Sequence, residues 1–302
     1  TSLETVTFEA GSQLDSIGHY AFQSATALTS INIPEGVKSI GTSAFYGATS
    51  LTSITIPASV TSIEVGAFSR GGLTDITVES SNTYYTAIDN VLFNKTGTIL
   101  IQYPVGNNAT RYEIPASVES IGNYAFSLAR NLETVTFEAG SQLDSIGYKA
   151  FNSASSLTSI SIPASVTSIG EWAFQGVTSL TEVIFAKGSQ LISIGEYAFQ
   201  GASRLTSIII PASVTSIGSQ AFYQSGLTTV YIANNQLTNI TSPATERVSF
   251  FGKKNVTTIL PTGGGTGGGT GGGTGGGETV TYSADGSTVT FTGTSTDTLS
   301  RE

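Results

Sequence analysis

The sequence comprises 302 residues, of which 39% are hydrophobic and only 11% are charged, and its formal net charge is −9. The composition supports a core large enough for one sizeable domain or a repeat array, while the acidic balance and the absence of a basic stripe argue against nucleic acid or an anionic membrane as partner. Cysteine is absent, which excludes a disulfide scaffold, a thiolate metal site and a cysteine nucleophile, and no apolar run is long enough to span a bilayer.

The first element of the chain is a string, LETVTFEAGSQLDSIG, that occupies residues 3–18 and recurs at 132–147. A shorter pattern underlies it, L-x-x-I-x-I-P-x-S-V-x-S-I-G-x-x-A-F, which residues 157–174 and 205–222 follow and residues 51–68 follow except at Glu64. Copies are spaced by 23 or 25 residues, and the longer ones replace IPASV with FEAGSQL or FAKGSQL. Each clear copy ends in a phenylalanine: Phe22, Phe45, Phe68, Phe126, Phe151, Phe174, Phe199 and Phe222. A degenerate ninth copy surrounds Phe251.

Alternation within one unit predicts how it folds. In LTSITI, residues 51–56, Leu51, Ile54 and Ile56 point inward and Thr52 and Thr55 outward, which is typical of a β-strand. The following proline ends this strand, VTSI predicts a second short strand, and the x-x-A-F segment predicts a short helical turn that stacks phenylalanine on phenylalanine. One coil cannot bury its own apolar face. The sequence therefore predicts a β-rich solenoid of about nine coils with parallel sheets, roughly 45 Å long.

The repeated S-I-G-x-x-A-F signature resembles the BspA-like leucine-rich repeats, a family of bacterial and protist surface proteins. The resemblance covers about residues 1–260. It implies a secreted or cell-surface protein concerned with adhesion, with no enzymatic activity in this domain. The segment after Pro261 departs from the repeat.

A gap of 58 residues between Phe68 and Phe126 indicates an insertion, which we assign to residues 80–104. IDNVLFN and TILIQYP flank Lys95-Thr96-Gly97, a pattern that predicts a β-hairpin. The hairpin is either decorative or a carrier of binding specificity.

Two polar columns repeat along the predicted rod. One, expected to form a ladder of hydrogen bonds to backbone groups, comprises Ser16, Ser39, Ser62, Ser120, Ser145, Ser168, Ser193, Ser216 and Asn239. The other faces outward from the first strand; it is polar for six coils and apolar in the last three: Thr7, Asn32, Thr55, Thr77, Thr136, Ser161, Ile184, Ile209 and Tyr231. The apolar end is either a chance result of strand propensity or a docking surface.

No residue constellation predicts catalysis, a metal site or a cofactor. The single histidine, His19, occupies a variable position of the repeat, and Asp15 and Asp144 lie in distant coils, too far apart to act as paired carboxylates. The glycine tract lacks the GK[ST] of a phosphate loop. Four sequons, at Asn94, Asn108, Asn239 and Asn255, are about as many as chance provides and leave glycosylation open.

The C-terminal part divides into a Gly/Thr-rich linker, residues 261–277, and a hairpin tail, residues 278–302. The alternation around Asp285-Gly286 predicts a type I′ hairpin. It pairs Tyr282 with Val289 and Val280 with Phe291, which places all four residues on one face. A lone hairpin is marginal in water, so this face needs a surface to cover.

Two function classes follow. The first is an extracellular structural protein that assembles with itself through uncapped solenoid ends and an arm, residues 262–302, whose Val280, Tyr282, Val289 and Phe291 cover Ile184, Ile209 and Tyr231 of a neighbour. The second is a cell-surface adhesin that binds a host or matrix protein; an enzyme is a distant third. The arm has an alternative reading as a tether to a further domain. The chain begins within a repeat at Thr1, so we expect either a processed product or a fragment.

Overall fold

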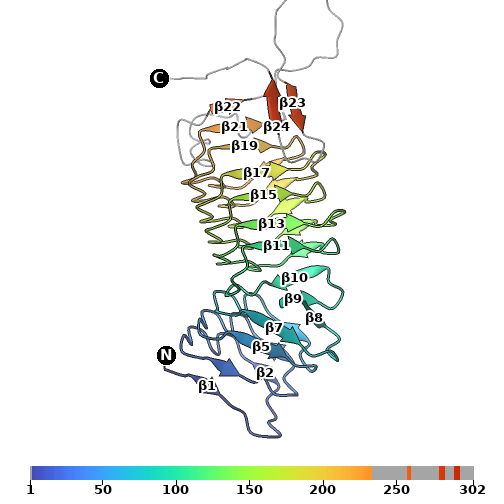
Figure 1. The fold of residues 1–302 in the computed structure, drawn as a ribbon, viewed down its shortest axis with the longest axis vertical. Coiled ribbons are helices and arrows are strands. Elements are labelled where there is room, and N and C mark those ends of the chain that lie inside the picture. The colour runs from blue at the N-terminus through green and yellow to red at the C-terminus, as the bar shows by residue number, and fades with distance from the viewer. Residues whose placement is uncertain (1, 233–256, 260–278, 283–288, 293–302) are drawn as a thin grey trace, which may run out of the picture.

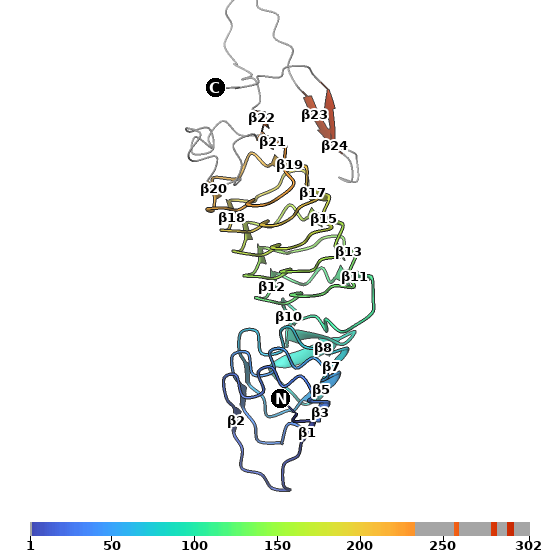
Figure 2. The same ribbon diagram turned by 90° about the vertical axis from the view of Figure 1, so that its left-hand side faces the viewer.

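A computed structural model of the chain describes residues 2–232, 257–259, 279–282 and 289–292. It confirms the β-solenoid: coils stack along one axis into a rod, from the N-terminal end in blue to β21 in orange (Figure 1). Nine described coils carry a strand on each of two opposite sides of the rod (Figure 2). We refer to these sides as the front sheet and the back sheet.

The front sheet consists of strands that mostly span four residues. They are β1 (Thr5–Val6), β3 (Ser30–Ile31), β5 (Ser53–Ile56), β7 (Asp75–Val78), β11 (Arg111–Ile114), β13 (Thr134–Phe137), β15 (Ser159–Ile162), β17 (Glu182–Phe185), β19 (Ser207–Ile210), β21 (Thr229–Ile232) and β22 (Thr257–Ile259).

The back sheet consists mainly of two-residue Ser-Ile strands, which pair in parallel from coil to coil with serine opposite serine. They are β2 (Ser16–Ile17), β4 (Ser39–Ile40), β6 (Ser62–Ile63), β10 (Ile99–Gln102), β12 (Ser120–Ile121), β14 (Ser145–Ile146), β16 (Ser168–Ile169), β18 (Ser193–Ile194) and β20 (Ser216–Ile217).

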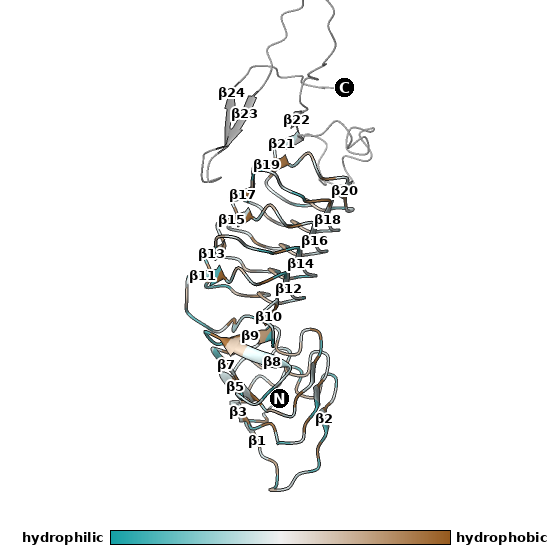
Figure 3. Ribbon diagram, turned by 90° about the vertical axis from the view of Figure 1, so that its right-hand side faces the viewer, coloured by the Kyte–Doolittle hydropathy of each residue, from teal (hydrophilic) through white to brown (hydrophobic). Residues whose placement is uncertain are grey.

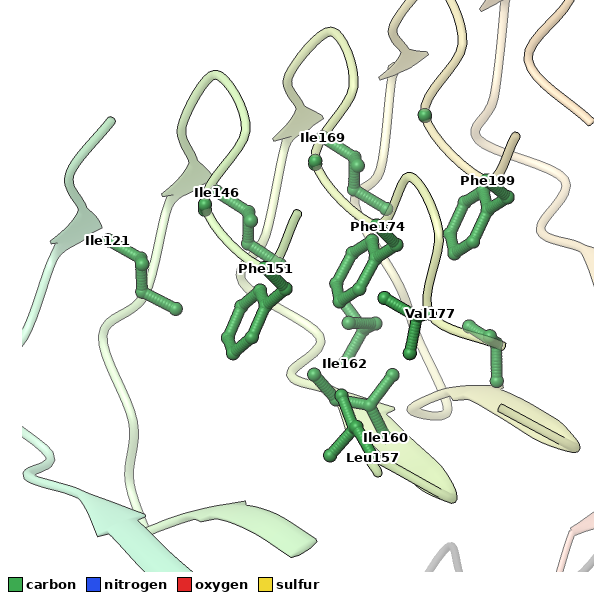
Figure 4. Close-up of a cluster of buried hydrophobic side chains, with 14 of the residues drawn as sticks. Ile121, Ile146, Phe151, Leu157, Ile160, Ile162, Ile169, Phe174, Val177 and Phe199 are labelled. Carbon is green, nitrogen blue, oxygen red and sulfur yellow. The ribbon is translucent and has the colours of Figure 1, made fainter. Parts of the chain in front are cut away.

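The predicted inward and outward positions are confirmed. Leu51, Ile54 and Ile56 are buried, and Thr52 and Thr55 are exposed. The phenylalanine rings stack along the rod axis, for example Phe151 on Phe174 with centroids 5.0 Å apart. Figure 4 shows the labelled phenylalanine rings in one row, with Leu157, Ile160 and Ile162 below them. Each coil thus buries the apolar face that its neighbours expose, as a solenoid requires.

The x-x-A-F segment is not helical, and this part of the prediction is wrong. In every described copy, the residue two positions before the phenylalanine and the residue two positions after it have a left-handed backbone. Around Phe151 these residues are Lys149 (φ 53°) and Ser153 (φ 57°). Because left-handed residues recur in this segment, every second N–H group points along the rod axis. The amides of Lys149, Phe151 and Ser153 donate to the carbonyls of the next coil, at Glu171, Ala173 and Gln175. A helix would direct those donors to its own preceding turn, so bonding between coils replaces it.

The gap between Phe68 and Phe126 contains a complete coil as well as an insertion. Tyr103 lies 35 residues after Phe68 and 23 before Phe126. Its ring stacks on Phe126 at 5.1 Å, and its amide donates to the carbonyl of Ala125. Tyr103 therefore starts the second aromatic row, a role that the sequence pattern concealed because the ring is not a phenylalanine.

The insertion forms two hairpins rather than one. The predicted hairpin at Lys95-Thr96-Gly97 is confirmed, because β9 (Val91–Asn94) pairs antiparallel with β10. A second turn, at Asp89-Asn90 with φ of 50° and 65°, joins β9 to β8 (Tyr85–Ile88). Positive φ at both residues is the requirement of a two-residue type I′ turn.

Strand β9 separates two hydrophobic cores. Leu92 belongs to the core of the N-terminal coils, and Val91 and Phe93 belong to the core of the C-terminal coils. Beside it, the hydroxyl of Tyr85 accepts the amide of Ile63 at the free edge of β6 (2.8 Å). The strands on either side of this junction are inclined to each other (Figure 1).

The C-terminal hairpin has the predicted register. β23 (Thr279–Tyr282) pairs antiparallel with β24 (Val289–Thr292), with Val280 opposite Phe291 and Tyr282 opposite Val289. The linker, the Asp285-Gly286 turn and the copy around Phe251 lie outside the described residues.

Candidate functional site

The front sheet is interrupted between β17 and β19. β15 and β17 share four residue pairs and so do β19 and β21, but β17 and β19 form no ladder. Further interruptions separate β3 from β5 and β7 from β11. Behind the interruption the rod is continuous, since β18 pairs with β20 and Phe199 stacks on Phe222 at 5.3 Å. The coils therefore part on the front side alone.

A size difference between successive coils accompanies this parting, although β3 and β5, which lie in two successive 23-residue coils, also form no ladder. In the 25-residue coils the loop after the front strand is two residues longer; its turn has Gly188 (φ 77°) at the third position, and the amide of Ser189 donates to the carbonyl of Ala186. The next coil has a tighter proline turn, in which Val214 donates to the carbonyl of Pro211. Ladders that follow an IPASV coil keep four pairs (β5–β7, β11–β13, β15–β17, β19–β21), whereas those that follow a long coil keep two (β1–β3, β13–β15) or none.

A cleft of about 580 Å³, which we call the front cleft, lies at the interruption. Ile184, Ile209 and Tyr231, the apolar end of the outward column, all line it. The structure thus brings together the three solenoid residues that the sequence singled out. Polar groups of the lining include Thr181, Glu182, Ser189, Ser207 and Ser213. Figure 3 colours β19, with its three consecutive isoleucines, as hydrophobic.

A smaller cleft of about 310 Å³ lies at the equivalent place after the first long coil. Its lining includes Glu9, Asn32 and Glu35, so the same geometry carries acidic and polar chemistry there. Desolvation, helped by a hydrogen bond to Glu79 and repulsion from it, raises the pKa of Glu35 above its ordinary value. The apolar lining of the front cleft is therefore a property of its residues and not of the coil geometry.

The predicted serine ladder is different in the structure. Ser145 donates to the hydroxyl of Ser120 (3.0 Å) and Ser16 to the carboxylate of Asp15 (3.0 Å), so these hydroxyls bond to side chains. The bonds to backbone come from other hydroxyls: Thr61 donates to the Lys38 carbonyl at 3.2 Å, and Ser165 to the Leu143 carbonyl at 2.6 Å. The sequence identified a repeating hydroxyl correctly but assigned the ladder to the wrong column.

His19 lies on the surface. Its Nδ1 is 3.2 Å from a carboxylate oxygen of Glu64 and accepts the amide of Thr42. The hydroxyl of Thr42 donates to that carboxylate at 2.6 Å, and this bond is the main cause that lowers the pKa of Glu64. The arrangement joins neighbouring coils.

Within the described ranges, no group of three or more histidine or acidic residues is placed to hold a metal ion. Nor does this part of the chain contain a helix with the length and apolarity that a membrane crossing requires. Of the four sequons, Asn94 directs its amide to Thr96 and Thr98, Asn108 is exposed, and Asn239 and Asn255 lie outside the described residues.

One surface row escaped the sequence pattern. The ammonium of Lys149 lies over the rings of Tyr124, Tyr148 and Trp172, and Trp172 stacks on Tyr197 at 4.2 Å. These residues come from four successive coils at positions that the repeat leaves variable. Because the rings contact one another and the lysine, the row ties coils together.

The comparisons with known proteins agree with the repeat architecture of this chain. A family model described as "BspA type Leucine rich repeat region (6 copies)" matches residues 1–111, 105–192 and 188–259. A leucine-rich repeat protein from Eubacterium ventriosum is 31% identical over 70% of this chain and 68% of that chain, with a TM-score of 0.55. A leucine rich cell surface protein from Faecalibacterium prausnitzii is 28% identical over 87% and 74%, with a TM-score of 0.54.

The pneumococcal vaccine antigen PcpA, 24% identical over 84% of this chain and 68% of its own, has a TM-score of 0.59 and shares the fold. None of the curated proteins matches the chain.

Proposed function

Since this chain belongs to the BspA-type leucine-rich repeat family, we propose that it is a non-enzymatic structural protein of the cell surface that assembles with copies of itself through the front cleft. The observation that carries the proposal is the lining of the cleft by Ile184, Ile209 and Tyr231 at the end of an otherwise polar column. Covering an apolar opening in a surface of this kind with another apolar face removes both from water and lowers the free energy.

The arm proposed from the sequence supplies such a face. Val280, Tyr282, Val289 and Phe291 occupy directly opposite positions of β23 and β24, and by strand alternation they share one side of the ribbon. In an assembly, the arm of one copy covers the front cleft of the next. Each copy then donates one arm and accepts another, so copies join into a reciprocal dimer, a chain or a closed ring.

The setting of the protein is proposed from its relatives. The Faecalibacterium protein is named as a cell surface protein, and a surface location agrees with a chain that has no cysteine and few charges. Nucleic acid is not among the proposed partners, because the net charge of −9 opposes phosphate binding.

The experiment compares two charge variants of the full chain. Ile184→Asp/Ile209→Asp places two carboxylates in the front cleft, and Thr136→Asp/Ser161→Asp makes the same change two coils earlier in the same column. We expect sedimentation velocity and negative-stain microscopy to show assembly of the unaltered chain and of the control, and single rods for the cleft variant. Equal assembly of all three, or single rods of the unaltered chain at every concentration, would contradict the proposal.

The second candidate is an adhesin that uses the same cleft for a host or matrix protein, which the cell-surface location of the Faecalibacterium relative favours. It predicts that the unaltered chain stays as single rods and binds an immobilised matrix protein. The cleft variant then loses that binding while the control retains it.

A further inference from the structure

The front cleft leaves polar groups of its walls without the partners that they have elsewhere in the rod. The amides of Thr158, Thr181 and Thr228 donate to the preceding coil, whereas Thr206, the equivalent residue at the cleft, makes no such bond among the described residues. Ser165 donates to the carbonyl of Leu143, but the buried hydroxyl oxygen of Ser213, which also lines the cleft, has no hydrogen-bond partner in the described part of the chain. The cleft therefore offers hydrogen-bonding groups beside an apolar floor.

An extended ribbon with one apolar side fits this combination. Its backbone and hydroxyl groups can pair with Ser213 and the free edges of β17 and β19, while apolar side chains contact Ile184 and Ile209. In the described chain, strands β23 and β24 form such a ribbon, with apolar residues at 280, 282, 289 and 291 and threonines between them.

The path of the chain brings this ribbon to its own cleft. β22 pairs with β21 and β21 with β19, so the chain leaves the front sheet three strands from β17. At the usual spacing of parallel strands that distance is about 15 Å. Residues 260–278 connect β22 to β23, and at full extension they reach about 60 Å.

We infer that in the single chain the hairpin of residues 279–292 occupies the front cleft of its own solenoid, and that assembly exchanges this contact for the same contact with another copy. The inference rests on the proposed function and adds its regulation. A connection of this length gives the hairpin an effective concentration of about a millimolar at its own cleft. Contacts between copies therefore prevail only above a comparable concentration or when the arm is drawn away, which is the logic of domain swapping.

The experiment uses the absence of cysteine from the chain. Ile209→Cys places one thiol in the front cleft, Ser207→Cys provides a second probe on an exposed residue of the lining, and Thr136→Cys is the control in the same outward column. Each cysteine substitution is made in two full-length chains. One keeps its own hairpin, and the other carries a threonine hairpin with Val280→Thr, Tyr282→Thr, Val289→Thr and Phe291→Thr. The rate of thiol modification is then measured in dilute and in concentrated protein.

We expect both cleft thiols to react about tenfold or more slowly with the unaltered hairpin than with the threonine hairpin, equally at both concentrations, while the control thiol reacts alike in all chains. Protection that appears only in concentrated protein would overturn docking within one chain and leave the proposed assembly standing. Equal rates with the two hairpins would overturn the hairpin as occupant. Failure of the proposed function is detected separately, by the sedimentation of the charge variants.

Discussion

The ring of Tyr103 stacks on the ring of Phe126 with centroids 5.1 Å apart, in the place that a phenylalanine fills in the coils that follow. Its hydroxyl oxygen is buried and has no hydrogen-bond partner within the described ranges. Tyr103→Phe removes this unpaired group and keeps the stacked ring, so we expect a gain in the free energy of unfolding of about 1 kcal/mol, measured by denaturant titration. A loss of stability would mean that the hydroxyl has a partner.

Tyr85→Phe is the matched substitution with the opposite expected sign. The Tyr85 hydroxyl accepts the amide of Ile63 at the edge of β6. Its removal leaves that amide without its partner, and we expect a loss of about 1–2 kcal/mol in the same denaturant titration. If both tyrosine variants changed stability in the same direction, the assignment of the two hydroxyls would be wrong.

The pH dependence of stability also separates Tyr103 from phenylalanine. Burial raises the pKa of Tyr103 to about 12, from an ordinary value of 10. A raised pKa means that the folded state favours the neutral phenol, so its contribution is complete below pH 10 and is lost as the pH rises toward 12. The advantage of Tyr103→Phe over the unaltered chain should therefore grow across this interval in melts at stepped pH, and a constant difference would contradict the shift.

Phe174→Ala deletes a fully buried ring that stacks on both Phe151 and Phe199. We expect a loss of about 3–5 kcal/mol in the free energy of unfolding. Thr55→Ala, at an exposed position of β5, should change it by less than about 0.5 kcal/mol. Equal losses at the two sites would show that the inside and outside of the coil are assigned wrongly.

The glycine of S-I-G allows coils to approach closely. A Cβ on Gly195 would lie 2.5 Å from the backbone of Gly170 and Glu171, whereas one on Gly18, at the same position of the first coil, meets nothing within 4 Å. Gly195→Ala should therefore cost about 1–3 kcal/mol through forced backbone shifts, and Gly18→Ala should be close to neutral. Thermal melts of the two variants check this, and similar melting temperatures would argue against close approach as the reason for the glycine.

The sequence by itself determined the solenoid, because its period, its inward leucines and isoleucines and its phenylalanine row are all local repeats that stacking must satisfy. Residues 51–56 illustrate this, since the pattern assigned Leu51, Ile54 and Ile56 inward and Thr52 and Thr55 outward, as the structure has them. The register of Val280 with Phe291 was likewise predictable, because a turn fixes the pairing of the strands beside it.

Only the tertiary structure decided the features that depend on two coils at once. The x-x-A-F segment reads as helical in isolation, yet its amides bond to the next coil. Tyr103 was hidden in an irregular spacing and is recognised by the ring on which it stacks. The outward column named Ile184 and Ile209, but the cleft that they line lies at a place where a long coil meets a shorter one. That mismatch is a relation between neighbours in space, which no single repeat contains.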